Sequence, residues 1–185
     1  MALRPIYLIG YMAVGKTTLG TALAEAAGVR FVDLDAEIER RAGMSVSEIF
    51  AQSGEAEFRR SEVETLAAVS ADAAAAQRPT VIACGGGTPC RPESMRLMLD
   101  TGTVVWLQAD TDRVISRLLD APGQRPRIDA LRDDRRALTD FVLDESRRRE
   151  CHYSRAHSRF DATRLDTPAE VAETVARFID QFLTT

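Results

Sequence analysis

The stretch Gly10-Tyr11-Met12-Ala13-Val14-Gly15-Lys16-Thr17 decides the fold of this chain. It fits the pattern G-x-x-x-x-G-K-[ST], in which glycines let backbone N–H groups turn inward around phosphate groups. The stretch follows an apolar run, Ile6 to Ile9, and precedes a run of helical period, Lys16 to Ala27. A helix that begins at this point adds its partial positive charge to the phosphate site. The sequence therefore predicts a nucleotide-phosphate site at residues 10–17, hereafter the P-loop.

The lysine of the P-loop is the only lysine in the chain. Lysine and arginine total 24, so the other 24 − 1 = 23 cationic residues are arginines. A planar guanidinium group cannot replace a compact ammonium group in a tight loop, which supports a role for Lys16 at the β- and γ-phosphates of ATP. The Thr17 hydroxyl group is placed to bind Mg²⁺. The predicted nucleotide-binding residues here are Ala13, Val14, Gly15, Lys16, Thr17 and Thr18.

Composition and charge exclude several other classes of protein. The chain has 185 residues, 45% hydrophobic and 28% charged, which is typical of one globular domain. Its net charge of −4 gives no general attraction to nucleic acid or to an anionic membrane. It shows no signal peptide and no apolar run near the roughly 18 residues of a spanning helix. Its three cysteines fit neither a disulfide framework nor a CxxC metal site. These features predict a cytoplasmic protein. We also expect a monomer.

Short apolar runs alternate with stretches of helical period along the chain. This pattern is typical of a parallel sheet with helices on both faces. The expected strands are Ile6–Ile9, Arg30–Leu34, Val81–Cys84, Val104–Leu107 and Arg159–Ala162. The expected helices are Lys16–Ala27, Ser45–Gln52, Glu55–Ala76, Pro92–Asp100, Asp112–Leu119, Arg135–His157 and Pro168–Phe182. The sequence predicts a single α/β domain, residues 1–185, with three layers and a five-stranded parallel sheet.

Four further features point to a second substrate: Asp33-Leu34-Asp35, the glycine segment, Phe58-Arg59-Arg60 with Glu62 in a charged helical stretch, and the arginines Arg125 and Arg149 on separate segments. The stretch from Phe58 to Glu62 is, alternatively, a solvated helix face. Asp33-Leu34-Asp35 ends the second expected strand, so a carboxylate stands at the carboxyl edge of the sheet. Asp33 suits Mg²⁺ through water, and Asp35 suits a substrate hydroxyl group or, alternatively, caps a following helix. Gly85-Gly86-Gly87 either brings the backbone close to a ligand or forms a turn. Separately, the polar stretch 120–136 is long enough to act as a lid loop or, alternatively, is a disordered surface loop.

Taken in order, these motifs resemble the shikimate kinase family, whose members phosphorylate the 3-hydroxyl group of shikimate with ATP. The resemblance runs nearly end to end. It rests on the P-loop, Asp33-x-Asp35, the stretch Ser45 to Arg59, the triple glycine, Arg125-Pro126, and Arg149 four residues before Tyr153. It implies a P-loop kinase of nucleoside monophosphate kinase-like fold, with a substrate-binding helical segment at about residues 35–62.

The resemblance also implies roles for individual residues. Asp35 would hold the reacting hydroxyl group and accept its proton, and Arg59 and Arg149 would grip the shikimate carboxylate, as paired arginines do through charge-assisted bonds. Gly86, between Gly85 and Gly87, would offer its backbone to a ring hydroxyl group.

For the nucleotide side of the site, the resemblance implies that Arg125 is a lid residue that swings onto the transferring phosphoryl group. Arg117 and Arg164 resemble the positions that flank the adenine. Two departures bear on the P-loop and the lid: Ala13 stands where the family usually has a glycine, and Arg127-Ile128 replaces a usual pair of leucines.

Other functions remain open at this point. Another small-molecule P-loop kinase, such as a gluconate kinase, would keep the P-loop but gives no reason for the triple glycine. A nucleoside monophosphate kinase would use the arginines for a phosphate acceptor. A non-catalytic nucleotide-binding module would keep the P-loop and lack transfer.

Overall fold

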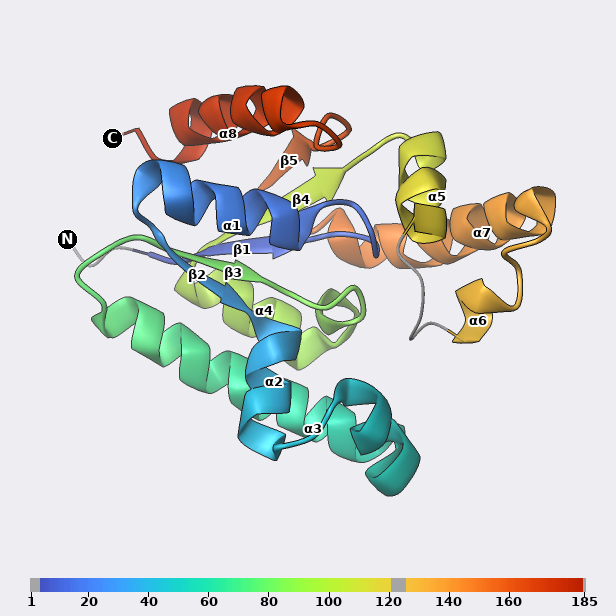
Figure 1. Cartoon of the computed structure of the whole chain (residues 1–185). Coiled ribbons are helices and arrows are strands. Elements are labelled where there is room, and N and C mark those ends of the chain that lie inside the picture. Colours follow the sequence, from blue (N-terminus) through green and yellow to red (C-terminus); the bar gives the residue numbers. More distant parts are fainter. Residues whose placement is uncertain (1–3, 121–125, 185) are drawn as a thin grey trace.

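The centre of the molecule is a five-stranded sheet in which every strand is parallel to its neighbours (Figure 1). The computed structural model describes residues 4–120 and 126–184. The strand order is β2-β3-β1-β4-β5. The strands are β1 (Ile6–Ile9), β2 (Arg30–Asp33), β3 (Thr80–Ala83), β4 (Thr103–Gln108) and β5 (Ser158–Asp161). The predicted parallel α/β fold is thereby confirmed.

Helices cover both faces of this sheet, as Figure 1 shows. On one face lie α1 (Lys16–Ala27) and α8 (Pro168–Phe182), and on the other lie α3 (Val46–Ala75) and α4 (Pro92–Thr101). Successive side chains along a strand point to opposite faces of the sheet and so enter the two cores in turn. In β1, Tyr7 and Ile9 belong to the core that includes residues of α3 and α4, whereas Ile6 and Leu8 belong to the core that includes residues of α1 and α8.

A third apolar cluster packs three helices near the P-loop against it. It joins Tyr11 of the P-loop to residues of α5 (Thr111–Asp120), α6 (Pro126–Asp129) and α7 (Arg135–Tyr153). Ile128 of α6 is 2% exposed in this cluster, whereas its neighbour Arg127 is exposed. Of the two residues that depart from the family pattern, Ile128 therefore supplies apolar packing for α6.

The structure differs from the sequence-based expectation in four segments. Helix α2 (Leu34–Ala42) was absent from the expected helices, and the described part of the stretch 120–136 contains α6 rather than loop alone. The two helices expected between residues 45 and 76 form one element, α3, with non-helical backbone at Gly54 (φ 79°, ψ 173°).

The fourth difference is at the end of α7, which stops at Tyr153 and not at His157. His157 is instead bound to β4: its N–H donates to the Val104 carbonyl (3.0 Å), and its Nδ1 accepts from the Val104 N–H (3.0 Å). These two bonds hold His157 against β4, so the chain leaves the helix before this residue and continues into β5.

Within the described ranges, no helix is long and apolar enough to cross a membrane.

Candidate active site

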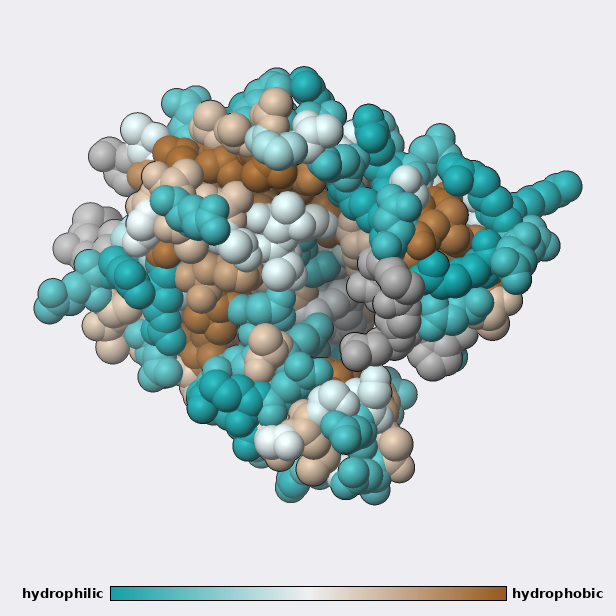
Figure 2. Space-filling model, viewed as in Figure 1, coloured by the Kyte–Doolittle hydropathy of each residue, from teal (hydrophilic) through white to brown (hydrophobic). Residues whose placement is uncertain are grey.

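A cavity of about 630 Å³ opens at the carboxyl ends of the strands. Figure 2 shows a recess in this face of the molecule, between the end formed by α2 and α3 and the side formed by α5. Many of the predicted site residues line this cavity: Ala13, Gly15, Lys16, Thr17, Thr18, Asp33, Asp35, Gly85, Gly86 and Arg117. The structure therefore brings the P-loop, the aspartates and the glycine segment together around one space.

The P-loop takes a backbone conformation that needs its glycines. Gly10 (φ 142°) and Gly15 (φ 103°) have positive φ angles. A Cβ atom on Gly15 would lie 2.4 Å from Cδ1 of Leu165, which packs directly on the loop. Lys16 folds back over the loop and donates from Nζ to the carbonyls of Gly10 and Tyr11, both at 2.9 Å. The Lys16 side chain is therefore held by the backbone of its own loop.

Ala13 has a φ angle of 58°, in the region where a side chain is unfavourable by about 1–2 kcal/mol. We expect Ala13→Gly to raise the free energy of unfolding by about 0.5–1 kcal/mol, because the relief of strain exceeds the added entropy of the unfolded chain. Urea unfolding measures the change. Ala26→Gly, at an exposed position in α1, is the matched control and should be destabilising by about 1 kcal/mol. Destabilisation by Ala13→Gly would contradict this account.

Asp33 lies at the end of the second strand, as expected, whereas Asp35 lies in a helix. The strand β2 ends at Asp33, whose side chain caps helix α2 by accepting from the Asp35 N–H (3.1 Å). Asp35 therefore lies in the first turn of α2 and not on the strand, because the helix begins immediately after Asp33. Asp33 also accepts a hydrogen bond from the Thr17 hydroxyl group (2.8 Å). A hydroxyl oxygen and a carboxylate oxygen are thus adjacent at the mouth of the P-loop.

Burial changes the acidity of Asp35. The low-dielectric surroundings raise the pKa of Asp35 from 3.8 to about 6, with further contributions from the carboxylates of Asp33 and Glu62, while Lys16 acts in the opposite direction. A carboxylate of this basicity is well suited to accept a proton near neutral pH.

The triple glycine lies against three charged side chains. A Cβ atom on Gly85 would lie 2.9 Å from the Asp35 carboxylate. A Cβ atom on Gly86 would lie 3.2 Å from Arg149, and one on Gly87 would lie 3.0 Å from Arg59. Arg59 and Arg149 come from α3 and α7, so the glycines allow groups from three helices to approach one short segment.

Both arginines are held by neighbouring carboxylates, of which the sequence had singled out Glu62 beside Arg59 but not Glu145. Arg59 donates to Glu62 (3.0 Å), whose side chain is 1% exposed and which also accepts from the Thr88 hydroxyl group (2.6 Å). Arg149 pairs with Glu145 (2.9 Å) one turn earlier on α7. The four-residue spacing of Glu145 and Arg149 was a sequence signal for their ion pair. Thr88 is 26 residues from Glu62, and the sequence gave no signal for their hydrogen bond.

Tyr153, one turn after Arg149 on α7, donates from its hydroxyl group to the Gly86 carbonyl (2.7 Å). The guanidinium group of Arg149 also lies over the Tyr11 ring of the P-loop, 5.4 Å from its centre. The C-terminal part of α7 is thereby tied both to the triple glycine and to the P-loop.

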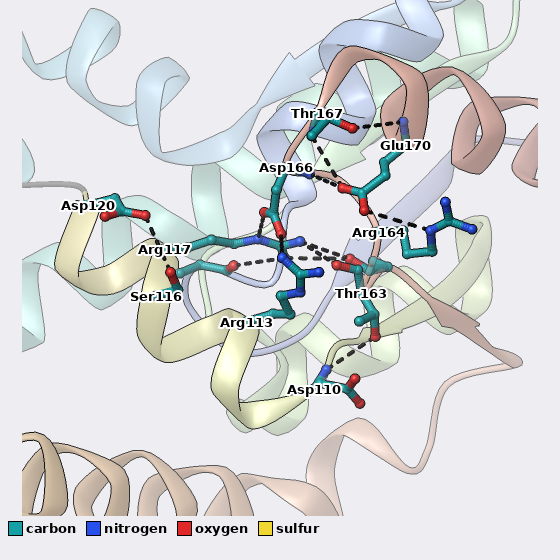
Figure 3. Close-up of polar contacts among 12 residues, drawn as sticks. Asp110, Arg113, Ser116, Arg117, Asp120, Thr163, Arg164, Asp166, Thr167 and Glu170 are labelled. Atoms are coloured by element: carbon teal, nitrogen blue, oxygen red, sulfur yellow. Dashed lines mark hydrogen bonds and ion pairs between the residues drawn. The ribbon is translucent and has the colours of Figure 1, made fainter.

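Of the residues predicted on the nucleotide side, Arg117 lines the cavity, and Arg164 is not among the lining residues. Arg164 is directed to α8, where it pairs with Glu173 (3.0 Å) and Glu170 (3.8 Å), as Figure 3 shows in part. Arg125 lies outside the described residues, so its predicted lid role stays a prediction.

The fold and the site define a P-loop kinase: a parallel sheet with the phosphate loop between β1 and α1, and a cavity at the carboxyl ends of the strands. The chain belongs to the shikimate kinase family, whose family model matches residues 12–180.

Related sequences and solved structures also support membership of this family. The shikimate kinase of Bacteroides fragilis is 38% identical over 170 residues, which is 92% of this chain and 91% of that protein. The crystal structure of shikimate kinase from Bacteroides thetaiotaomicron matches with a TM-score of 0.86 at 35% identity, over 98% of this chain and 99% of that one. The Acinetobacter baumannii shikimate kinase in complex with shikimate gives 0.77 at 27% identity, over 98% and 93%. A gluconokinase from Sinorhizobium meliloti, at 16% identity, shares the fold alone.

Proposed function

We propose that this chain transfers the γ-phosphoryl group of ATP to the 3-hydroxyl group of shikimate, giving shikimate 3-phosphate and ADP. The observation that carries this proposal is the triple glycine. Its glycines lie against one carboxylate, Asp35, which lines the cavity together with the P-loop, and against two guanidinium groups, Arg59 and Arg149, which are not among the lining residues of that cavity. A small acceptor with one carboxylate and ring hydroxyl groups matches these three groups, whereas gluconate kinase and a non-catalytic module give no reason for them.

Asp35 accepts the proton of the 3-hydroxyl group as its oxygen attacks phosphorus. Lys16 stabilises the negative charge on the phosphoryl oxygens during transfer, since phosphoryl transfer depends chiefly on positioning and charge. The raised pKa of Asp35 supports the first role, and the position of Lys16 in the P-loop supports the second. The P-loop N–H groups from Ala13 to Thr18 hold the phosphates.

Thr17 and Asp33 suit Mg²⁺, because hard oxygen ligands at the mouth of a phosphate loop are those that this ion prefers. Among the described residues, no group of three or more His, Cys, Asp or Glu side chains could hold a metal by itself. The Thr17 hydroxyl group as a direct ligand, Asp33 acting through water, and phosphate oxygens would together complete the coordination. When bound, the ion would neutralise charge on the β- and γ-phosphates.

Arg59 and Arg149 bind the shikimate carboxylate, and Gly86 offers its backbone to a ring hydroxyl group, with Gly85 and Gly87 leaving the space. The nucleotide base lies beside Arg117. The roles of Arg125 at the phosphoryl group and of Arg164 near the adenine remain predictions from the family resemblance. A monomeric state and a cytoplasmic location also remain predictions.

We expect Arg59→Met to raise the KM for shikimate about tenfold to a hundredfold with a smaller effect on kcat, because a charge-assisted contact to the carboxylate is lost. Steady-state kinetics at saturating ATP measures both constants. The next residue, Arg60, is the matched control: its side chain is 66% exposed and pairs with Glu57 on the surface. Arg60→Met should leave both constants within twofold. An unchanged KM in Arg59→Met would remove Arg59 from the substrate site.

The proposed reaction is tested by measuring ADP release from Mg-ATP with shikimate, with gluconate and with no acceptor. We expect rapid release with shikimate alone. Comparable release with gluconate would favour the broader class of sugar-acid kinases, and ATP binding without release for any acceptor would favour a non-catalytic module.

A further inference from the structure

Arg117 joins the P-loop to the turn between β5 and α8. Its side chain is 15% exposed, and all three of its guanidinium nitrogens donate hydrogen bonds. Nη1 lies 3.4 Å from the Ala13 carbonyl and 3.3 Å from the Val14 carbonyl. Nη2 lies 2.7 Å from the Thr163 carbonyl in the turn (Figure 3). One guanidinium group therefore spans two segments that are far apart in the sequence.

These contacts set the direction of the phosphate-binding groups. In a trans peptide unit, the carbonyl and the N–H of the next residue point in opposite directions. When Arg117 holds the carbonyls of Ala13 and Val14, the N–H groups of Val14 and Gly15 must face away from Arg117. Ala13 lies in this same segment with a φ angle of 58°, a conformation that persists only where the surroundings enforce it.

Asp166 fixes the guanidinium group that makes these contacts. Its Oδ1 accepts from Nε of Arg117 at 2.5 Å, and its Oδ2 accepts from Nη1 of Arg113 at 3.1 Å. The backbone of Asp166 is itself anchored, since its N–H donates to Glu170 (3.1 Å) in the capping box of α8. The backbone that carries the Asp166 carboxylate is therefore held in a fixed position.

We propose that Asp166 is a positioning residue for nucleotide binding: by holding Arg117, it fixes the P-loop peptide groups that receive the phosphates. This inference rests on the proposed function and concerns its nucleotide side only. Asp166 acts through Arg117, and its loss affects nucleotide affinity while the shikimate side, built from α3, α7 and the triple glycine, is unaffected.

The test is the Kd for Mg-ADP, measured by isothermal titration calorimetry for the unsubstituted chain, Asp166→Asn, Arg117→Met and the double variant. Asp166→Asn should weaken binding about tenfold, as expected for one partly exposed charge-assisted bond. Because Asp166 acts through Arg117, the double variant should bind within twofold of Arg117→Met alone. The KM for shikimate and the Tm of Asp166→Asn should remain close to those of the unsubstituted chain.

Arg177→Met is the matched control. Arg177 donates from α8 to the Asp161 carbonyl (2.9 Å), so it too ties an arginine to the end of β5, but it is exposed and is not a lining residue of the cavity. Its Kd for Mg-ADP should stay within twofold. The positioning role is overturned if Asp166→Asn binds as tightly as the unsubstituted chain, if the losses multiply in the double variant, or if shikimate KM rises equally. No binding of Mg-ADP to the unsubstituted chain would overturn the nucleotide site as well.

Discussion

Asp35→Asn is expected to lower kcat about a thousandfold and, at the same time, to raise the stability of the protein at pH 8. The amide has the size of the carboxylate but cannot accept the proton of the 3-hydroxyl group, and a positioned base contributes about 10²–10⁴ to the rate. The unsubstituted chain should lose kcat/KM about tenfold per pH unit below about pH 6, where Asp35, with its pKa of about 6, is protonated.

The gain in stability follows from the same pKa. The ordinary pKa of 3.8 applies to the unfolded chain, and the folded value is about 6. Between these pH values the folded state binds more protons, so the free energy of unfolding contributed by Asp35 falls as the pH rises from about 4 to about 6. Above pH 6 the ionised carboxylate is unfavourable by about 1–3 kcal/mol, a cost that asparagine avoids.

Thermal unfolding at pH 4 and pH 8, together with kcat at pH 8, measures both effects. The Tm advantage of Asp35→Asn should be small at pH 4 and larger at pH 8. Asp72→Asn, at an exposed position on α3, is the control and should change neither quantity. If Asp35→Asn kept more than a tenth of kcat, Asp35 would not be the base, and a lower Tm at pH 8 would contradict the cause given for its raised pKa.

Lys16→Arg is expected to lower kcat by about a hundredfold to a thousandfold, although the charge is retained. Nζ of Lys16 lies within 2.9 Å of two carbonyls of its own loop. The larger, planar guanidinium group cannot occupy this position while it contacts the phosphates. Loss of one such preorganised group commonly costs 10²–10³ in kcat.

Rates at saturating Mg-ATP and shikimate test this expectation. Arg78→Lys makes the reverse exchange at an exposed position and should leave kcat unchanged. An Lys16→Arg variant with at least half of the original kcat would show that charge alone is sufficient there.

Local sequence patterns were enough to predict the sheet, the P-loop and the family. Each of these depends on residues that are close in sequence: the apolar runs of the strands, and the spacing of Gly10, Gly15 and Lys16. The family prediction is confirmed by the family model and by the relatives. The roles of individual side chains stay predictions.

What the sequence did not predict depends on local capping or on distant partners. Helix α2 carries few apolar residues, so its periodicity was weak, and its start is fixed by the Asp33 cap. Helix α6 is short and lies in a polar stretch, where only the burial of Ile128 against the third cluster explains its position.

One supporting carboxylate, Asp166, lacked a local signal, because it is 49 residues from Arg117. Glu62 lies three residues from Arg59, but its hydrogen bond with Thr88, 26 residues away, could not be predicted. Only the folded chain brings these partners together, whereas the sequence around residue 166 drew attention to Arg164 instead. The residues proposed to contact substrates therefore have clearer local sequence signals than Asp166, which is proposed to hold one of them in place.

The most direct test of the central claim is ³¹P NMR of the protein with Mg-ATP and shikimate. The account predicts that the γ-phosphate signal of ATP disappears while a phosphomonoester doublet grows at the same rate, coupled to the proton on carbon 3 of shikimate. Growth of inorganic phosphate alone, or of an ester on another carbon, would contradict it.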